Sequence, residues 1–216
     1  MVETPTAATM RLDGGHPALD LVNTIYGQVG GPVEHDVLAT PEDLVTFARR
    51  VGLAGEATPA GAEALIAAQT LRRALDPLLR ARLHTTRIPG SDPGIRLGSI
   101  TVTTATGEAD LASAGRDFEA AARAAQDGAR LAPGYTWAWE DADPLAPVHR
   151  LTHAAVGVLT SEAELARLHC CEACCWLFLD HSRGAGRRWC SMADCGTEAK
   201  KRRYVERRRE RRRTAQ

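Results

Sequence analysis

The spacing of apolar residues over the first 168 positions predicts a mostly helical protein. Apolar side chains recur there every three or four residues, a period that places them on one face of a helix. Six helices are expected on this basis. Their approximate ranges are 18–25, 41–51, 59–84, 110–126, 144–159 and 162–168.

Local sequence signals support the boundaries of these helices. Thr40 precedes Pro41 and two acidic residues, which is a favourable helix start, and Gly52 ends the apolar pattern. Thr58-Pro59 opens the longest helix, and Pro77 lies inside it, where we expect a kink.

Two short segments have the pattern of strands. Residues 100–104 are strand-like and lie in an insertion that contains glycine and proline. Tyr135, Trp137 and Trp139 alternate with smaller residues close to Pro133-Gly134, which predicts a half-buried strand in a small hairpin.

The six cysteines are gathered in one short segment, and the first 169 residues contain none. Disulfides that staple a small secreted fold are usually spread along the chain, whereas a tight cluster favours a metal site. The cysteines are Cys170, Cys171, Cys174, Cys175, Cys190 and Cys195.

Two closely spaced pairs of thiolates are what tetrahedral zinc requires, because each pair supplies two ligands from one tight turn. The pairs with the most suitable spacing are Cys171/Cys174 and Cys190/Cys195. Four thiolates leave no open position, so one structural zinc ion is expected. The alternatives for a ligand place are His169, Cys170 and Cys175.

Between the two pairs, residues 176–179 form a strand candidate, 180–186 a turn and 187–189 a returning strand. A helix follows from Thr197, where Thr197 is a candidate cap and Glu198 lies at the positive end of the dipole. A hairpin and a helix around paired cysteines predict a treble-clef-like zinc finger.

The expected fold class is therefore mainly α with small β-hairpins. We expect a disordered N-terminus over residues 1–9, a mostly helical domain over 10–168, and a finger with a basic C-terminal helix over 169–216. The segment before Cys170 has no Pro/Ser-rich linker, so the two domains are expected to be docked.

The net charge of zero hides a strong separation of charge. Residues 183–213 contain thirteen basic and four acidic side chains, and the rest of the chain is acidic. Such a basic end suits a polyanion through phosphate contacts, which carry no base specificity; the alternative is a solvated tail. The candidate contact residues are Arg183, Arg187, Arg188, Lys200, Lys201, Arg203 and Arg207.

Other polar residues give weaker signals. Asp20 and Asn23 are candidates for a ligand site, although we favour a structural hydrogen-bonding role for them. The sequence has no glycine-rich phosphate loop and no Ser/His/acid set, so an enzyme is not expected. It has neither a secretory signal nor a membrane-length apolar run, which predicts a cytoplasmic protein.

Two segments carry a family resemblance. A pattern in the cysteine segment resembles the CGNR zinc finger, and Gly15–Thr24 resembles the start of the ABATE domain that accompanies this finger. The residues of the finger pattern are Cys171–Asp180, Ser182-Arg183, Arg187–Met192 and Cys195-Gly196. The resemblance implies a bacterial stress-induced transcription regulator with four cysteine ligands to zinc and with DNA as its partner.

The sequence departs from the family pattern at two places. Thr197-Glu198 stands where the name-giving motif has Asn-Arg, so contacts made by that amide and guanidinium would be lost. Cys175 stands where a small residue such as glycine is expected.

The leading hypothesis is a zinc-containing, DNA-binding transcription regulator. Its N-terminal domain would sense a small-molecule effector or mediate self-association into a homodimer. The alternative is a zinc-knuckle adaptor that binds RNA or an acidic protein partner. An enzyme with its chemistry around Asp20 and Asn23 has the least support.

Overall fold

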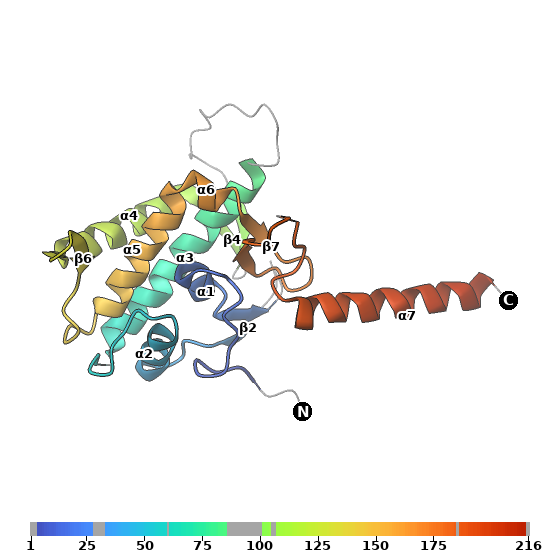
Figure 1. Cartoon of the computed structure of the whole chain (residues 1–216), viewed down its shortest axis with the longest axis horizontal. Coiled ribbons are helices and arrows are strands. Elements are labelled where there is room, and N and C mark those ends of the chain that lie inside the picture. The colour runs from blue at the N-terminus through green and yellow to red at the C-terminus, as the bar shows by residue number, and fades with distance from the viewer. Residues whose placement is uncertain are drawn as a thin grey trace.

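Three long helices, α3, α4 and α5, lie against one another and form the centre of the N-terminal region (Figure 1). The computed structural model describes residues 4–27, 33–59, 61–85, 101–104, 107–184 and 186–214. Among these residues the helical elements are α1 (Pro17–Val22), α2 (Pro41–Arg50), α3 (Ala62–Thr85), α4 (Leu111–Asp127), α5 (Ala146–Thr160), α6 (Glu162–Leu165), a π-helical turn η1 (Met192–Gly196) and α7 (Thr197–Thr214).

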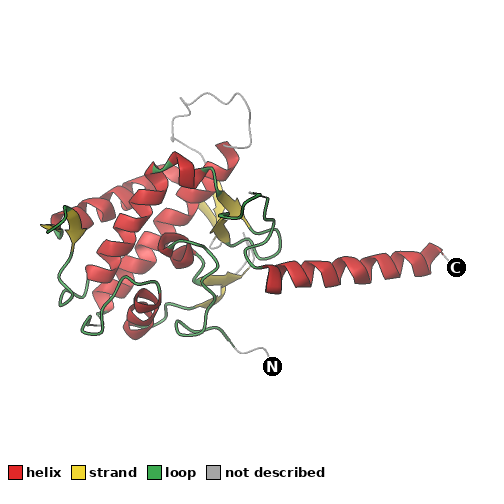
Figure 2. Cartoon of the chain, viewed as in Figure 1, coloured by secondary structure: helices red, strands yellow, loops and turns green. Residues whose placement is uncertain are grey.

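The strands are short and form separate two-stranded antiparallel pairs (Figure 2). The pairs are β1 (Ile25–Gly27) with β2 (Val33–Asp36), β3 (Thr101–Thr104) with β4 (Gly107–Asp110), β5 (Arg130–Ala132) with β6 (Thr136–Ala138), and β7 (Leu168–Cys170) with β8 (Leu177–Leu179). The fold is therefore mainly α with small β-hairpins, as the sequence predicts.

The apolar core continues from the helical region into the cysteine segment. One cluster packs α2 and α3 together around Phe47 and Leu71. A second cluster joins Leu75 and Leu79 of α3 to Leu177 and Leu179 of β8. Because β8 lies in this shared core, the cysteine segment is packed against the helices, as the absence of a linker predicts.

The predicted helices are present, with shifted ends. Thr40 forms the predicted cap of α2, in a reciprocal capping box with Asp43. The first helix ends at Val22 instead of residue 25, because Ile25 already begins β1. The longest helix begins at Ala62, and Pro77 lies inside it.

The predicted hairpin at residues 131–140 is present as β5 and β6, but the predicted alternation of burial holds only in part. Trp139 is buried and Trp137 is exposed, whereas Tyr135 is 88% exposed and occupies the turn with a φ of 60°. A residue in a turn does not continue the two-residue period of a strand.

The prediction of a hairpin between 176–179 and 187–189 is wrong. Strand β8 pairs instead with β7, which precedes the first cysteine pair. The physical reason is Asp180, whose fully buried carboxylate accepts hydrogen bonds from the backbone N–H groups of Ser182 and Arg187, both at 2.9 Å. These bonds hold the chain after β8 as a loop and leave β8 to pair with β7.

Part of the segment expected to be disordered contacts the helical region. Residues 1–3 lie outside the described part of the chain, whereas Ala7 and Met10 are buried in the first core cluster. The Arg50 guanidinium of α2 donates to the carbonyls of both residues at 2.8 Å. These contacts place residues 7–10 against α2.

Helix α7 extends away from the rest of the molecule and ends close to the C-terminus (Figure 1). Its last buried residue is Ala199, and residues 200–213 are all exposed. Within the described ranges, none of the helices combines the length and the apolar character that a membrane span requires.

Candidate metal centre

The β7–β8 hairpin forms the first half of the cysteine site. The backbone N–H of Cys171 donates to the Trp176 carbonyl at 2.8 Å, and that of Cys175 donates to the Cys171 carbonyl at 2.9 Å. These bonds fold residues 171–176 into a tight turn that directs Cys171 and Cys174 to the same side.

The second half of the site lies at the start of the basic helix. Cys190 precedes η1, and Cys195 lies within η1, which continues directly into α7. Ser191 caps this turn, because its side chain accepts a hydrogen bond from the N–H of Asp194 at 3.2 Å. The metal site and the base of the basic helix are therefore one structural unit.

The four predicted ligands form one cluster. Their sulfur atoms all lie within 4.8 Å of one another, with 3.6 Å between Cys174 and Cys190 and 3.7 Å between Cys190 and Cys195. Four sulfurs about 2.3 Å from a zinc ion would lie about 3.8 Å apart in a tetrahedron. A disulfide would require about 2.05 Å, so the geometry fits zinc and excludes disulfides.

The environment of the cluster favours a structural metal ion. Cys171, Cys190 and Cys195 are buried and Cys174 is half-buried. Hydrogen bonding with Cys171 raises the pKa values of Cys174 and Cys190, and the same hydrogen bonds lower the pKa of Cys171. The thiols thus share protons in one closed cluster, and four protein ligands would leave a bound cation no site for substrate.

The three alternative ligands lie outside this cluster. His169 stacks on Phe178, with 5.6 Å between the ring centroids. The Cys170 thiol donates to the Cys175 carbonyl at 3.3 Å. Cys175 has a φ of 62°, a left-handed conformation that favours glycine, which explains why a small residue is expected there.

Two arginines of the N-terminal region, neither of them predicted from the sequence, reach the cysteine segment. Arg80 of α3 donates to the Cys170 sulfur at 3.7 Å and to the Cys175 carbonyl at 3.2 Å. Arg11 donates to the Cys195 sulfur at 3.9 Å. Both contacts span more than 80 positions of sequence, so no local pattern indicates them.

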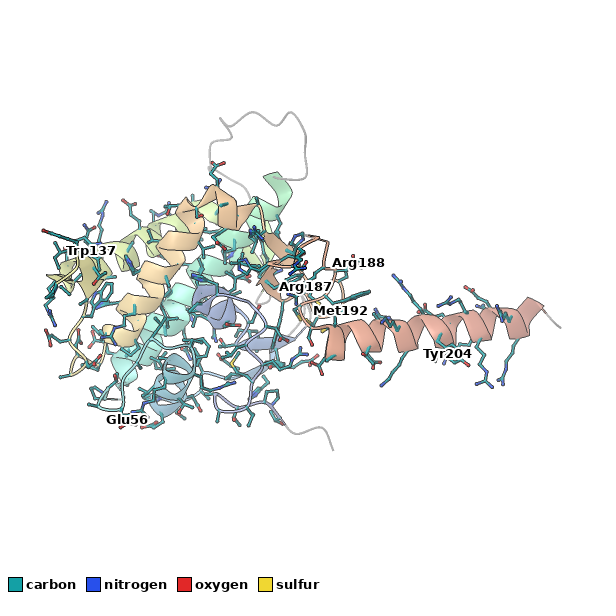
Figure 3. The ribbon with its side chains drawn as sticks, in the orientation of Figure 1. Glu56, Trp137, Arg187, Arg188, Met192 and Tyr204 are labelled. Carbon is teal, nitrogen blue, oxygen red and sulfur yellow. The ribbon has the colours of Figure 1, made fainter. Side chains whose placement is uncertain are left out.

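The seven candidate nucleic-acid contacts fall into two groups. Arg187 lies over the Phe178 ring at 5.1 Å and donates to the Cys190 carbonyl, and Arg188 pairs with Glu172. Both side chains therefore make contacts within the finger (Figure 3), although Arg188 is itself exposed. The remaining five side chains are also exposed: Arg183, Lys200, Lys201, Arg203 and Arg207.

Asp20 and Asn23 both make hydrogen bonds to the backbone. The Asn23 amide donates to the Leu177 carbonyl at 2.8 Å and accepts from the Leu177 N–H at 3.0 Å. Asp20 accepts from the Gly14 N–H at 2.8 Å, and a Cβ at Gly14 would lie 2.8 Å from the same oxygen. Asn23 thus joins the end of α1 to β8, and Asp20 holds the turn before α1.

The residues that replace Asn-Arg of the family motif lie at the base of α7. Thr197 does not cap the helix as predicted, because it already has helical dihedral angles and its hydroxyl donates to the Met192 carbonyl at 3.2 Å. The cap is Ser191, one turn earlier. Glu198 is exposed in the first turn of α7, where the helix dipole favours an acidic side chain.

Comparison with known families agrees with this geometry. The family model ABATE, described as "Putative stress-induced transcription regulator", matches residues 15–162, and the CGNR zinc finger model matches residues 167–208. No curated protein matches the chain. The finger match and the four clustered thiols identify one structural zinc ion as the cofactor. Since the first model covers more than half of the chain, the protein belongs to the ABATE family and carries a CGNR zinc finger after that domain.

Proposed function

We propose that this protein is a transcription regulator that binds duplex DNA through α7. The observation that carries the proposal is the exposure and charge of this helix. Its side chains are exposed from Lys200 to Arg213, and it contains ten basic and three acidic residues. Nothing in the described part of the chain covers this charge, so a polyanion is the partner that it fits.

The shape of α7 also suits a DNA groove. Eighteen residues form a helix about 27 Å long at about 1.5 Å per residue. The major groove of B-DNA is about 12 Å wide and admits one α-helix. Because α7 projects from the body, the helical domain does not obstruct its exposed sides (Figure 1).

The exposed basic residues make phosphate contacts in this proposal, and the finger positions them. Arg183, Lys200, Lys201, Arg203 and Arg207 are the contact residues that we propose. The thiolates of Cys171, Cys174, Cys190 and Cys195 would hold the zinc ion, which supplies folding energy and a fixed geometry at the base of α7. We assign nucleic-acid binding to residues 169–216 and regulation to residues 10–168.

The test is a titration of the full-length, zinc-loaded protein with a fluorescent mixed-sequence DNA duplex at several salt concentrations. The logarithm of the affinity should fall linearly with the logarithm of the salt concentration, with a slope of about −0.9 per phosphate contact. Replacing Lys200, Arg203 and Arg207 with Gln should weaken binding at low salt and make this slope less steep by roughly two to three.

The control is Arg116→Gln, which removes one exposed arginine from α4 and should change neither quantity. A stronger preference for duplex RNA, or for an acidic peptide, at the same salt concentration would support the adaptor alternative. Salt-independent binding or no binding to any duplex would refute the proposal.

A groove in the helical domain supports a second part of the proposal, the binding of a small-molecule effector. Its volume is about 250 Å³, and it lies between α4, β6 and α5. Trp137, Trp139 and His153 line it together with small apolar side chains and two polar ones, Gln126 and Thr152. A planar, largely apolar molecule that carries a hydrogen-bonding group fits this lining best. Asp20 and Asn23 do not belong to this lining.

Indole is a suitable probe of this groove. We expect isothermal titration calorimetry to show saturable binding of indole to the wild-type protein, because Trp137 and Trp139 lie in the lining. Replacing Ala125 with Leu would fill the groove and should abolish the binding heat, whereas Ala173→Leu in the finger should not. Equal responses in all three proteins would contradict an effector site here.

A further inference from the structure

One arginine of the N-terminal region contacts the metal centre directly. Arg11 lies six residues before α1, yet its Nη2 atom donates to the Sγ atom of Cys195 at 3.9 Å. The same guanidinium contacts Asp194, with 2.6 Å between Nη1 and Oδ2. It therefore touches one predicted zinc ligand and the carboxylate next to it.

Arg11 is held in this position from several directions. Its guanidinium lies 5.2 Å from the centre of the Trp176 ring, and Nε lies 3.3 Å from the carboxylate of Asp13. Trp176 in turn packs edge-on against Tyr26 of β1, with 5.0 Å between ring centroids. Since a planar guanidinium can use its faces and its edges at once, all these contacts coexist in one side-chain position.

The contact between Arg11 and Cys195 matters because the zinc site is negatively charged. Four thiolates around a divalent cation have a net charge of about −2, and three of the four cysteines are buried. A hydrogen bond from a cationic donor to a thiolate stabilises the ionised form, and such partners of metal ligands typically raise metal affinity about 10- to 100-fold. Arg80 also donates to a cysteine sulfur, but that cysteine is Cys170, which lies outside the ligand set. Arg80 therefore does not take the role that Arg11 has at the site.

We propose that Arg11 is a positioning residue of the zinc centre. It donates to the thiolate of Cys195 and makes zinc retention depend on the segment that precedes α1. By thermodynamic linkage the dependence is reciprocal, so bound zinc also holds Arg11 and its segment against the finger. The zinc centre thereby stabilises the contact between the helical domain and the finger as well as the finger itself.

The test compares zinc affinity in full-length variants by competition with a chromophoric chelator. Arg11→Met should lower zinc affinity about tenfold. Arg11→Lys keeps the positive charge but loses the planar guanidinium with its several donors, so it should lower zinc affinity less. The matched control is Arg188→Met, which breaks the ion pair with Glu172 on the finger surface and should change the affinity less than twofold. Asp194→Asn removes the charge that pairs with Arg11, so it tests whether that ion pair alone sets the zinc affinity.

A spectroscopic measurement separates the role at the sulfur from simple docking. In cobalt-substituted protein, Arg11→Met should shift the sulfur-to-cobalt charge-transfer band, because the hydrogen bond to the Cys195 thiolate is lost. A lower unfolding temperature with unchanged zinc affinity and an unchanged band would overturn the proposal and leave Arg11 with a docking role only. Equal losses of affinity in Arg11→Met and Arg188→Met would also overturn it.

Discussion

The cysteine cluster and helix α7 adjoin each other in sequence, but the protein holds them in different ways. The segment that carries the cluster contacts the helical domain on several sides. Asn23 binds Leu177, the Gly14 carbonyl accepts from the Leu179 N–H at 2.9 Å, and Arg80 donates to the Cys175 carbonyl. Helix α7 is held at its base, and its last buried residue is Ala199.

Under the proposed function, this difference separates stability from recognition. The residues that fix the finger are buried, and their polar atoms bind other parts of the protein. The basic residues of α7 add little to the core, because their surroundings are solvent. We therefore expect substitutions in the cluster to change folding strongly and substitutions in α7 to change partner binding alone.

Loss of the zinc ion should have the largest effect on stability. Cys190→Ser removes one of four ligands, and structural zinc contributes on the order of 10 kcal/mol of binding energy in isolated fingers. Because β8 shares a core with α3, we expect the unfolding free energy of the whole protein to fall by several kcal/mol. Thermal melts followed by circular dichroism, together with zinc analysis, measure this effect. Zinc loss without a change in the melting temperature would show that the cysteine cluster does not support the fold.

The sequence predicts the helices and the grouping of the four cysteines well, because both depend on local spacing. Thr40 and Asp43 form the capping box within four residues, and each cysteine pair lies in one short turn. The partner of β8 could not be predicted in the same way. It depends on the Asp180 carboxylate turning inward to accept hydrogen bonds from the backbone of Ser182 and Arg187, which no spacing pattern in the sequence indicates.

The same distinction applies to the polar residues of the site. Charge identifies a basic segment but cannot show that Arg187 and Arg188 make contacts within the finger. Asn23 looks like a ligand-site candidate until its partner Leu177, 154 positions away, is known. Non-local contacts therefore decide which polar residues remain for function.

Asn23→Ala should have the next largest effect. It leaves the buried N–H and C=O groups of Leu177 without partners, and each such group costs about 1–3 kcal/mol. We expect a loss of roughly 2–4 kcal/mol in urea unfolding of the zinc-loaded protein. Thr160→Val, which removes an exposed helix hydroxyl, is the control and should cost less than about 0.5 kcal/mol. A cost for Asn23→Ala as small as that of the control would argue against this anchoring role.

Asp20→Asn should stabilise the protein in a pH-dependent way. Burial raises the pKa of Asp20 to about 6, although the hydrogen bond from Gly14 partly opposes this. Between pH 4 and 6 the native state thus binds more protons than the unfolded state, and stability falls as the pH rises. Asparagine keeps an acceptor for Gly14 and carries no charge.

The variant should therefore exceed the wild type by about 2 kcal/mol at pH 7.5, and by less at pH 5. Urea unfolding at both pH values, with zinc present, measures this difference. An advantage that is the same at both pH values would show that the ionisation of Asp20 is not its cause.

Cys175→Gly should give a smaller gain. The φ of 62° costs a non-glycine residue about 1 kcal/mol, and the carbonyl that binds Arg80 belongs to the backbone and is kept. The unfolding temperature should rise by roughly 2–4 °C with unchanged zinc content. Cys175→Ala removes the thiol but keeps the side-chain penalty, so an equal rise in both variants would exclude backbone strain as the cause.

Neutralising the outer half of α7 should have the smallest effect on stability and thus tests the comparison most directly. The change replaces six exposed arginines with Gln: Arg207, Arg208, Arg209, Arg211, Arg212 and Arg213. Because exposed substitutions usually change stability by less than about 0.5 kcal/mol, urea unfolding should be almost unaffected. DNA affinity at low salt should fall, because Arg207 is a proposed phosphate contact and the other five cations add to the attraction between α7 and DNA. If the free energy of unfolding fell by several kcal/mol instead, α7 would contribute to the stability of the folded core. The separation of stability from recognition would then be wrong.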